Sequence, residues 1–195
     1  MDYKYSPEIH HRRSIRLRNY NYTQAGAYFI TICSWKRECL FGEVLDGIMR
    51  LNQYGQIVEK EWLQTEIIRI NVKLDVFVVM PNHIHGIFVI DDYGRGTLQR
   101  APTKEQFGKP VSNSIPTIIR LLKSATTKQI NEIRNTPGHP IWQRNYYEHI
   151  IRNENELSHI REYIINNPFQ WAVDENNPSN IRGTLQGAPT LKGKP

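Results

Sequence analysis

Cysteine is scarce in this chain, in which Cys33 and Cys39 are the only two among 195 residues. They form neither a Cys-x-x-Cys pair nor the spacing of a zinc finger, which argues against a disulfide framework and against a structural zinc site. The expected state is two reduced thiols, which is typical of proteins in the cytoplasm.

Long apolar runs are also missing. No stretch approaches the roughly 18 consecutive apolar residues of a membrane-spanning helix. The first residues, MDYKYSPEIHHRRSIRLR, are polar and basic and contain no apolar segment of the kind found in secretory signals. We therefore expect no membrane partner and a cytoplasmic location.

The charged residues carry a moderate excess of one sign. Lys and Arg number 25 against 19 Asp and Glu, which gives a formal net charge of +6. This excess is compatible with a nucleic-acid partner but does not establish one. With 39% hydrophobic and 23% charged residues, the composition is that of a globular protein, and the length suits a single domain.

Composition divides the chain into three parts. Residues 1–20 are a basic N-terminal arm, residues 21–172 are the globular domain, and residues 173–195 are expected to form a loose C-terminal tail. Within the domain, residues 91–112 contain Gly and Pro but few large apolar side chains. This pattern predicts a flexible insertion.

One segment occurs twice in the expected loops. RGTLQRAPT at 95–103 recurs as RGTLQGAPT at 182–190, with one difference. Two copies without apolar core positions do not make a structural repeat. Their near-identity instead suggests a repetitive DNA element that is translated twice.

Hydrophobic periodicity and turn residues predict alternating strands and helices. Pro81-Asn82 is a turn dipeptide between two apolar runs, Ser114 is the expected N-cap of a helix, and Pro168 is expected to end another. The expected elements are a strand at 27–34, a helix at 51–69, two strands within 73–90, a helix at 112–134, a strand or edge hairpin within 141–152, and a helix at 153–168. This order suits an α+β sandwich.

Two histidines stand out on the second strand of the 73–90 region. Side chains at i and i+2 share one face of a strand, so His83 and His85 point the same way while Ile84 points into the core. Two neighbouring imidazoles on an open face are a ready pair of ligands for a divalent ion. The His-x-His pattern alone is also compatible with ordinary histidines that bind no metal.

The last expected helix carries His159, Tyr163 and Asn167 four residues apart and therefore on one face. A phenolic oxygen can attack phosphorus when a metal polarises the phosphate, although a tyrosine at a helix boundary is usually a packing residue. Tyr146 and Tyr147 are rival nucleophiles, because they lie among charged and basic side chains.

Five blocks in order carry a family resemblance: GAYFITI, MPNHIHGI, SIPTIIRLLKSATT, IWQRNYYEHIIRNENEL and REYIINNP. Together they resemble the REP-associated tyrosine transposases, a branch of the single-tyrosine HUH transposases, over about residues 14–171. HIH matches the family's His-hydrophobic-His motif, and YIINNP matches its tyrosine helix.

The resemblance implies a ferredoxin-like antiparallel sheet with packed helices, the HUH pair on a central strand and the nucleophilic tyrosine on the last helix. It implies a metal-dependent single-stranded DNA endonuclease and strand transferase that acts on hairpins or palindromic repeats. His83 and His85 would hold one Mg²⁺ or Mn²⁺, and Tyr163 would form a 5′-phosphotyrosine. Asn167 would be the third ligand, although the following proline disfavours helical geometry there. His159 competes for that role.

Basic residues are the expected DNA contacts. Arginines of the N-terminal arm can follow phosphates, and further basic residues lie on the long helix and beside the aromatic block. The candidates are Arg12, Arg13, Arg16, Arg18, Arg120, Lys123, Arg144 and Arg152. The expected partner is single-stranded or hairpin DNA, bound by a monomer or a homodimer.

Two other functions remain open from the residues alone. A domesticated relative would hold structured nucleic acid without cutting it, through the same basic surface. A metal-dependent hydrolase of a small phosphodiester would need the two histidines but no tyrosine nucleophile.

Overall fold

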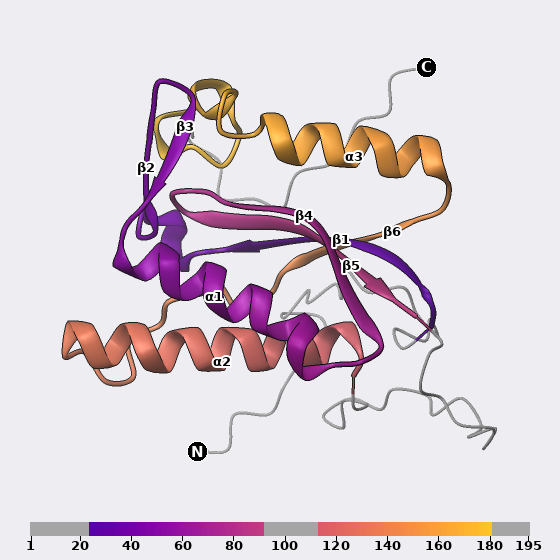
Figure 1. Cartoon of the computed structure of the whole chain (residues 1–195). Helices are drawn as coiled ribbons and strands as arrows, with labels where there is room; N and C mark the ends of the chain where they lie inside the picture. Colours follow the sequence, from indigo (N-terminus) through magenta and orange to yellow (C-terminus); the bar gives the residue numbers. More distant parts are fainter. Residues whose placement is uncertain (1–23, 92–112, 181–195) are drawn as a thin grey trace, which may run out of the picture.

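The computed structural model describes residues 24–91 and 113–180 (Figure 1). The basic arm, nearly all of the expected insertion and both copies of the repeated segment lie outside the described residues.

The described residues form an α+β fold, as the sequence predicts. Three short 3₁₀ turns, η1 (Trp35–Arg37), η2 (Trp171–Val173) and η3 (Pro178–Asn180), accompany the longer elements. In chain order these are β1 (Gly26–Cys33), β2 (Gly42–Leu45), β3 (Ile48–Leu51), α1 (Gln53–Ile68), β4 (Val72–Val79), β5 (His83–Ile90), α2 (Ile115–Arg134), β6 (Tyr147–Ile151) and α3 (Glu154–Asn166).

Four strands make one antiparallel sheet in the order β4-β5-β1-β6. Together with α1 and α2, this order is the ferredoxin-like arrangement that the resemblance implies. Strand β5, with both histidines, is an inner strand, so its position on a central strand is confirmed.

A second, two-stranded sheet of β2 and β3 was not predicted. The turn between its strands is Asp46-Gly47, and both residues have positive φ angles, of 52° and 74°. Asp-Gly is a strong hairpin signal, because such turns require this conformation at both central positions. The strands are four residues long, and the helix pattern that begins at residue 51 obscured them.

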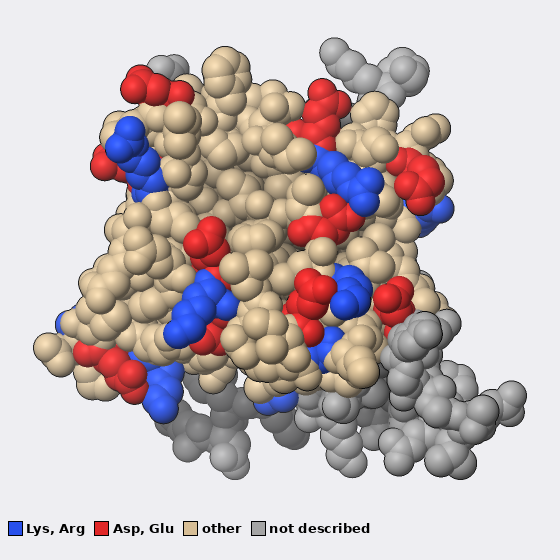
Figure 2. Space-filling view, in the orientation of Figure 1, with Lys and Arg blue, Asp and Glu red and all other residues tan. Residues whose placement is uncertain are grey.

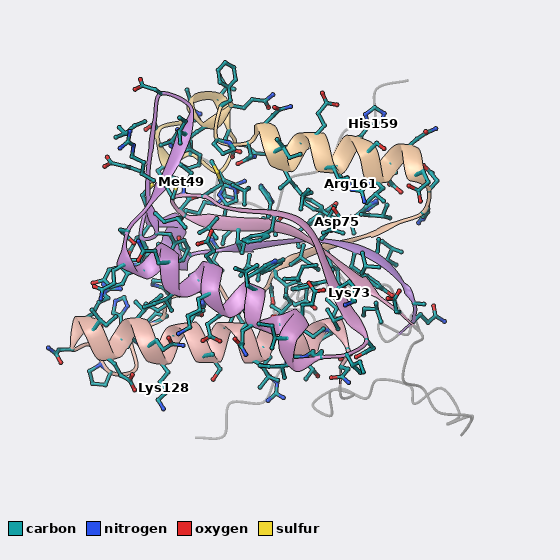
Figure 3. All side chains as sticks on the ribbon, viewed as in Figure 1. Met49, Lys73, Asp75, Lys128, His159 and Arg161 are labelled. Atoms are coloured by element: carbon teal, nitrogen blue, oxygen red, sulfur yellow. The ribbon has the colours of Figure 1, made fainter. Side chains whose placement is uncertain are left out.

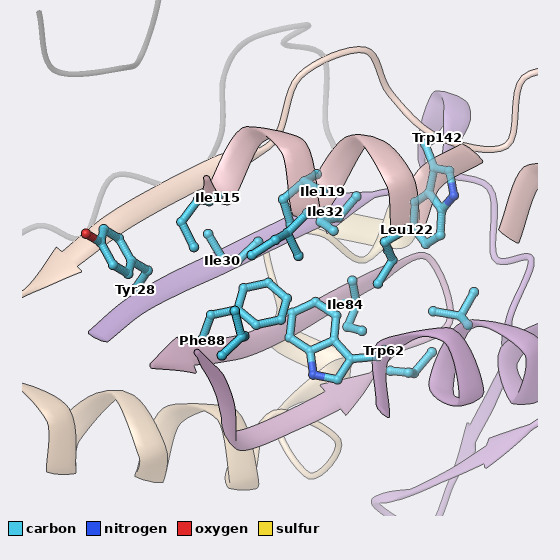
Figure 4. Close-up of a cluster of buried hydrophobic side chains, with 14 of the residues drawn as sticks. Tyr28, Ile30, Ile32, Trp62, Ile84, Phe88, Ile115, Ile119, Leu122 and Trp142 are labelled. Carbon is cyan, nitrogen blue, oxygen red and sulfur yellow. The ribbon is translucent and has the colours of Figure 1, made fainter. Parts of the chain in front are cut away.

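The helices lie on opposite faces of the four-stranded sheet (Figure 1). Helices α1 and α2 cover one face and enclose the larger core, in which side chains from β1 and β5 meet Trp62 of α1 (Figure 4). Tyr28, Ile30, Ile32, Trp62 and Phe88 are all fully buried there. Alternation along β1 and β5 therefore sends every second side chain into this core.

Helix α3 covers the other face. Its Ile160 and Ile164 pack against Phe29 and Ile87 of the sheet in a smaller apolar cluster. The guanidinium of Arg161 donates hydrogen bonds to both carboxylate oxygens of Asp75 of β4 and ties the helix to the sheet edge (Figure 3). The side chains that β1 and β5 do not send into the larger core thus face α3.

Side-chain caps explain where two helices begin. Asn52 accepts hydrogen bonds from the backbone amides of Tyr54 and Gly55 at the start of α1. Asn153 accepts one from Glu156 at the start of α3. Such caps satisfy amides that have no partner inside the helix. Ser114 occupies the N-cap position of α2, as expected.

Within the described ranges, none of the helices combines the length and the apolar character required to cross a bilayer.

We expect Gly86→Ala to destabilise the fold. A Cβ at this position of β5 would lie 2.3 Å from the fully buried ring of Trp62 and 2.8 Å from the Cβ of Phe77. Because neither neighbour can move away cheaply, overpacking should cost about 1–3 kcal/mol. Urea denaturation followed by tryptophan fluorescence measures this loss, and an unchanged midpoint would contradict the close approach.

Candidate active site

His83 and His85 lie side by side on the α3 face of the sheet. Their ring centroids are 4.4 Å apart, and both side chains have no exposed surface. The expectation of an open face is therefore wrong, because α3 and the segment after it cover the pair. Ile84 lies in the core on the other face, as the strand alternation predicts.

His85 is held through both ring nitrogens. Its Nδ1 lies 2.8 Å from Oγ1 of Thr31, which is its direct partner across β1 and β5. Its Nε2 lies 3.2 Å from the phenolic oxygen of Tyr163 on α3. Phe29 stacks on the imidazole at 5.4 Å and meets the Tyr163 ring edge-on. Three separate elements thus fix the relative position of the histidine and the tyrosine.

One ring nitrogen of His83 makes a hydrogen bond and the other makes none. Its Nδ1 lies 2.8 Å from Oδ1 of Asn82, so that nitrogen carries the proton and donates it. Its Nε2 is buried and has no hydrogen-bond partner. Burial lowers the pKa of His83 to about 3. The nearby Asn167 side chain opposes this shift, and the positive charge of Arg37 adds to it. The ring is therefore neutral, with a lone pair directed into a buried space.

Asn82 organises the surroundings of His83. Its side chain is fully buried, and its Nδ2 donates to the carbonyl oxygens of Arg37 and Asn176. These two donations identify the nitrogen and the oxygen of the amide, and the oxygen faces His83. One amide therefore joins the loop after β1, the segment after α3 and the first residue of β5.

Two oxygen-bearing side chains complete the site. Asn167, one turn beyond Tyr163, keeps helical backbone angles despite Pro168, so its side chain stays on the same face. Its Nδ2 donates to Asp174 at 3.0 Å, while its Oδ1 is buried without a partner. Asp174 also accepts a hydrogen bond from the backbone amide of Asn176.

His83, His85 and Asp174 form a group whose potential ligand atoms all lie within 4.8 Å of one another. We call it the His–His–Asp cluster. Asp174 was not among the expected ligands, because the polar sequence from residue 173 onward predicts a loose tail. In the structure Asp174, Asn176 and Asn177 are buried, with Asn176 fully so, whereas Val173 is exposed.

The residues of the cluster are suited to a divalent cation. Two neutral imidazoles and a carboxylate are a common ligand set for divalent first-row transition ions. The unpartnered Nε2 of His83 and Oδ1 of Asn167 are buried atoms that an ion would satisfy. His159 does not join this group: it is exposed and points away from the sheet (Figure 3).

Tyr163 is half-buried, and its phenol faces the cluster. Burial raises the pKa of Tyr163, and the negative charges of Asp174 and Glu175 raise it further. The phenol is therefore protonated at neutral pH and is not a nucleophile without a nearby cation or base. The rival Tyr146 packs against the core beneath α1 and α2, and Tyr147 packs among the apolar residues under α3.

A hollow of about 480 Å³ opens beside Tyr163. Its lining consists of Phe29, Arg152, Asn153, Glu156, His159, Ile160 and Tyr163. The structure thus places Arg152 and His159 around the hollow beside Tyr163, outside the His–His–Asp cluster.

A larger groove of about 910 Å³ lies between α2 and residues 137–144, and we call it the α2 groove. Arg120, Lys128 and Arg144 line it with exposed basic side chains. Lys123 also lines it, but its ammonium donates to the carbonyl oxygens of residues 143 and 145. Burial lowers the pKa of Lys123 to about 8. The four arginines of the N-terminal arm lie outside the described residues.

We expect Asn82→Ala to destabilise the protein by about 2 kcal/mol or more, because it leaves two carbonyl oxygens and the His83 ring without a partner. Urea denaturation measures the loss. The exposed Asn166 is the matched control, and Asn166→Ala should change stability by less than about 0.5 kcal/mol. Equal stability of the two variants would refute the organising role of Asn82.

Comparisons with known proteins fit this arrangement. No protein-family model matches the chain. A protein of Haemophilus influenzae described as uncharacterised is 43% identical over 180 residues, which cover 90% of this chain and 98% of that protein. A REP-associated tyrosine transposase solved bound to a REP hairpin is 19% identical, with a TM-score of 0.50 over 82% of this chain and 74% of that one.

A putative transposase from Deinococcus radiodurans is 17% identical, with a TM-score of 0.40 over 78% of this chain and 97% of that one. This lower score adds no further support. The identity to the Haemophilus protein over nearly the whole length of both chains establishes common membership of a family. The chain therefore belongs to one family with the Haemophilus influenzae protein, and its fold is that of a REP-associated tyrosine transposase.

Proposed function

We propose that this protein is a metal-dependent, single-stranded DNA endonuclease and strand transferase of the transposase type, with Tyr163 as its nucleophile. One observation carries the proposal: the phenolic oxygen of Tyr163 lies 3.2 Å from His85, a member of the buried His–His–Asp cluster. A tyrosine beside potential metal ligands is the arrangement that phosphodiester cleavage through a covalent intermediate requires.

The proposed reaction is a transesterification. The Tyr163 oxygen forms a bond to phosphorus while the bond from phosphorus to the 3′-oxygen breaks. The phenol loses its proton and the leaving oxygen gains one, so the products are a 5′-phosphotyrosine and a free 3′-hydroxyl. Attack by that hydroxyl, or by one from another strand, reverses the step without an external energy source.

The chain's own residues hold the nucleophile and the ligands in place. Thr31 occupies Nδ1 of His85, so Nε2 is the nitrogen left for either the phenol or a cation. His83 offers Nε2 because Asn82 occupies its other nitrogen. We assign these two nitrogens and Asp174 as ligands of a Mn²⁺ or Mg²⁺ ion, with Oδ1 of Asn167 as a fourth. When bound, such an ion supplies positive charge that polarises the phosphate and favours the phenolate.

DNA is the proposed partner. The structural neighbour with a TM-score of 0.50 was solved with a REP hairpin, and the α2 groove offers a basic wall on this chain. The face shown in Figure 2 carries basic and acidic side chains intermixed, so it presents no continuous positive surface. The proposed phosphate contacts are therefore Arg120, Arg144 and the arginines of the N-terminal arm. Arg152 is a further proposed phosphate contact, at the hollow beside Tyr163.

We expect Tyr163→Phe to abolish covalent attachment while leaving DNA binding intact, because only the attacking oxygen is lost. Labelled single-stranded hairpins from the repeats flanking the gene, incubated with Mn²⁺ and run on a denaturing gel, test this. Wild-type protein should give a protein–DNA band that a chelator removes. Tyr147→Phe is the matched control and should retain the band.

Either of two results would contradict the tyrosine mechanism. A band that survives in Tyr163→Phe would move the nucleophile to another residue. Binding without any band in the wild type, with either metal, would favour the domesticated, non-cleaving binder.

The double variant Arg120→Gln/Arg144→Gln should weaken DNA binding without slowing cleavage of bound DNA. Each arginine that no longer neutralises a phosphate of a single strand lowers the slope of log affinity against log salt by about 0.7. Fluorescence anisotropy across a salt series measures this slope. The exposed Lys60 of α1 provides a charge control, and a slope no lower than that of Lys60→Gln would exclude the α2 groove as a DNA contact.

A further inference from the structure

The loop that follows β1 has an unusual backbone. Lys36 and Arg37 of η1 both have positive φ angles, of 52° and 57°. This left-handed region disfavours residues with a Cβ and costs on the order of 1–3 kcal/mol for each. Such a conformation persists only where surrounding contacts enforce it.

Several contacts enforce this loop. The amide of Trp35 donates to the carbonyl of Ile141, and Oγ of Ser34 donates to the carbonyl of Glu38 at 2.8 Å. Nδ2 of Asn82 donates to the carbonyl of Arg37 at 3.0 Å. Because the same amide binds His83, the Arg37 backbone and the His–His–Asp cluster share one rigid support.

The guanidinium of Arg37 can donate further hydrogen bonds. Its Nη1 donates to the carbonyl oxygen of Glu175, the neighbour of Asp174, at 3.0 Å. Among the described residues no carboxylate lies within ion-pair distance of it. A guanidinium has five N–H donors, so most of those on Arg37 remain for a ligand.

The guanidinium of Arg37 lies close to the site. Its hydrogen bond to Glu175 places it next to the residue that follows Asp174, and the Asn82 amide joins the Arg37 backbone to His83. Asp174 and Glu175 bring negative charge to the same place, and a phosphodiester would add another. A half-buried cation with free donors offsets this repulsion and matches the geometry of phosphate oxygens.

We propose that Arg37 binds a non-bridging oxygen of the phosphodiester that is attacked by Tyr163, opposite the His–His–Asp cluster. The ligand class is a nucleic-acid phosphate, and the inference rests on the function proposed above. Arg37 acts on the substrate directly and is not a metal ligand. Its hydrogen bond to Glu175 holds the guanidinium at the rim of the site, where the remaining donors face the phosphate.

Arg37→Gln tests the proposal. The variant keeps the polarity of the side chain but removes the charge and the fork of donors. It should slow adduct formation on saturating hairpin DNA by about 10², the typical effect of removing one donor to a developing phosphate or carbonyl oxyanion. Arg37→Lys, which keeps the charge, should recover part of that rate. Lys60→Gln removes one charge elsewhere and should react at the wild-type rate.

Two readouts do not depend on cleavage. In chelator, anisotropy of a labelled single strand across a salt series should give a slope about 0.7 smaller for Arg37→Gln than for Lys60→Gln. Titration of Mn²⁺ by electron paramagnetic resonance should show wild-type metal affinity in Arg37→Gln. A loss of metal affinity would overturn the proposal, because it would mean that Arg37 acts only by positioning the Asp174 segment.

The outcomes separate this inference from the proposed function. If the wild type forms the adduct and Arg37→Gln matches Lys60→Gln in rate and slope, the inference fails and the function stands. If the wild type forms no adduct, the proposed function fails. A smaller salt slope for Arg37→Gln would even then support the phosphate contact, and an unchanged slope would refute it.

Discussion

The site depends on one buried amide. Asn82 precedes β5, and its side chain hydrogen-bonds at once to His83, to the loop after β1 and to the segment after α3. These partners lie far apart in sequence, yet each contributes to one face of the sheet. The amide also sets the protonation of His83, because its oxygen holds the proton on Nδ1 and leaves Nε2 bare. The architecture of the candidate metal centre is thus a consequence of satisfying one polar group in a buried position.

The two faces of the sheet have different roles, because one carries the larger core and the other carries the candidate site. Alternate residues of β1 and β5 either enter the core beneath α1 and α2 or face α3, so Ile84 and His85 are neighbours in sequence but belong to different layers. The larger core stabilises the strands from one side. The α3 side has fewer apolar contacts and gains order from polar ones, including the pair of Arg161 and Asp75. Burial on that side keeps both histidines neutral, as metal ligands must be.

Prediction from sequence succeeded where local periodicity carries the information. The two-residue spacing of the histidines gave their common face, and the four-residue spacing from Tyr163 to Asn167 gave theirs. It failed for residues whose role comes from distant contacts. Asp174 sits in a segment that reads as a polar tail, and no local pattern marks Arg37. The open face expected for the histidines was wrong, because only the return of the chain after α3 covers them.

The family resemblance implied the ferredoxin-like arrangement of the sheet and helices. By itself, the sequence determined the α+β class and the faces on which the histidines and Tyr163 lie. These follow from side-chain periodicity and turn chemistry, which act over a few residues. Only the tertiary structure decided that the Tyr163 phenol reaches His85, that Asp174 completes the cluster, and that Arg37 stands beside it. Those relations join segments up to about 140 residues apart, as in the hydrogen bond from Arg37 to Glu175. They arise because packing and hydrogen bonding around Asn82 bring the segments together. No pattern among neighbouring residues predicts these long-range contacts.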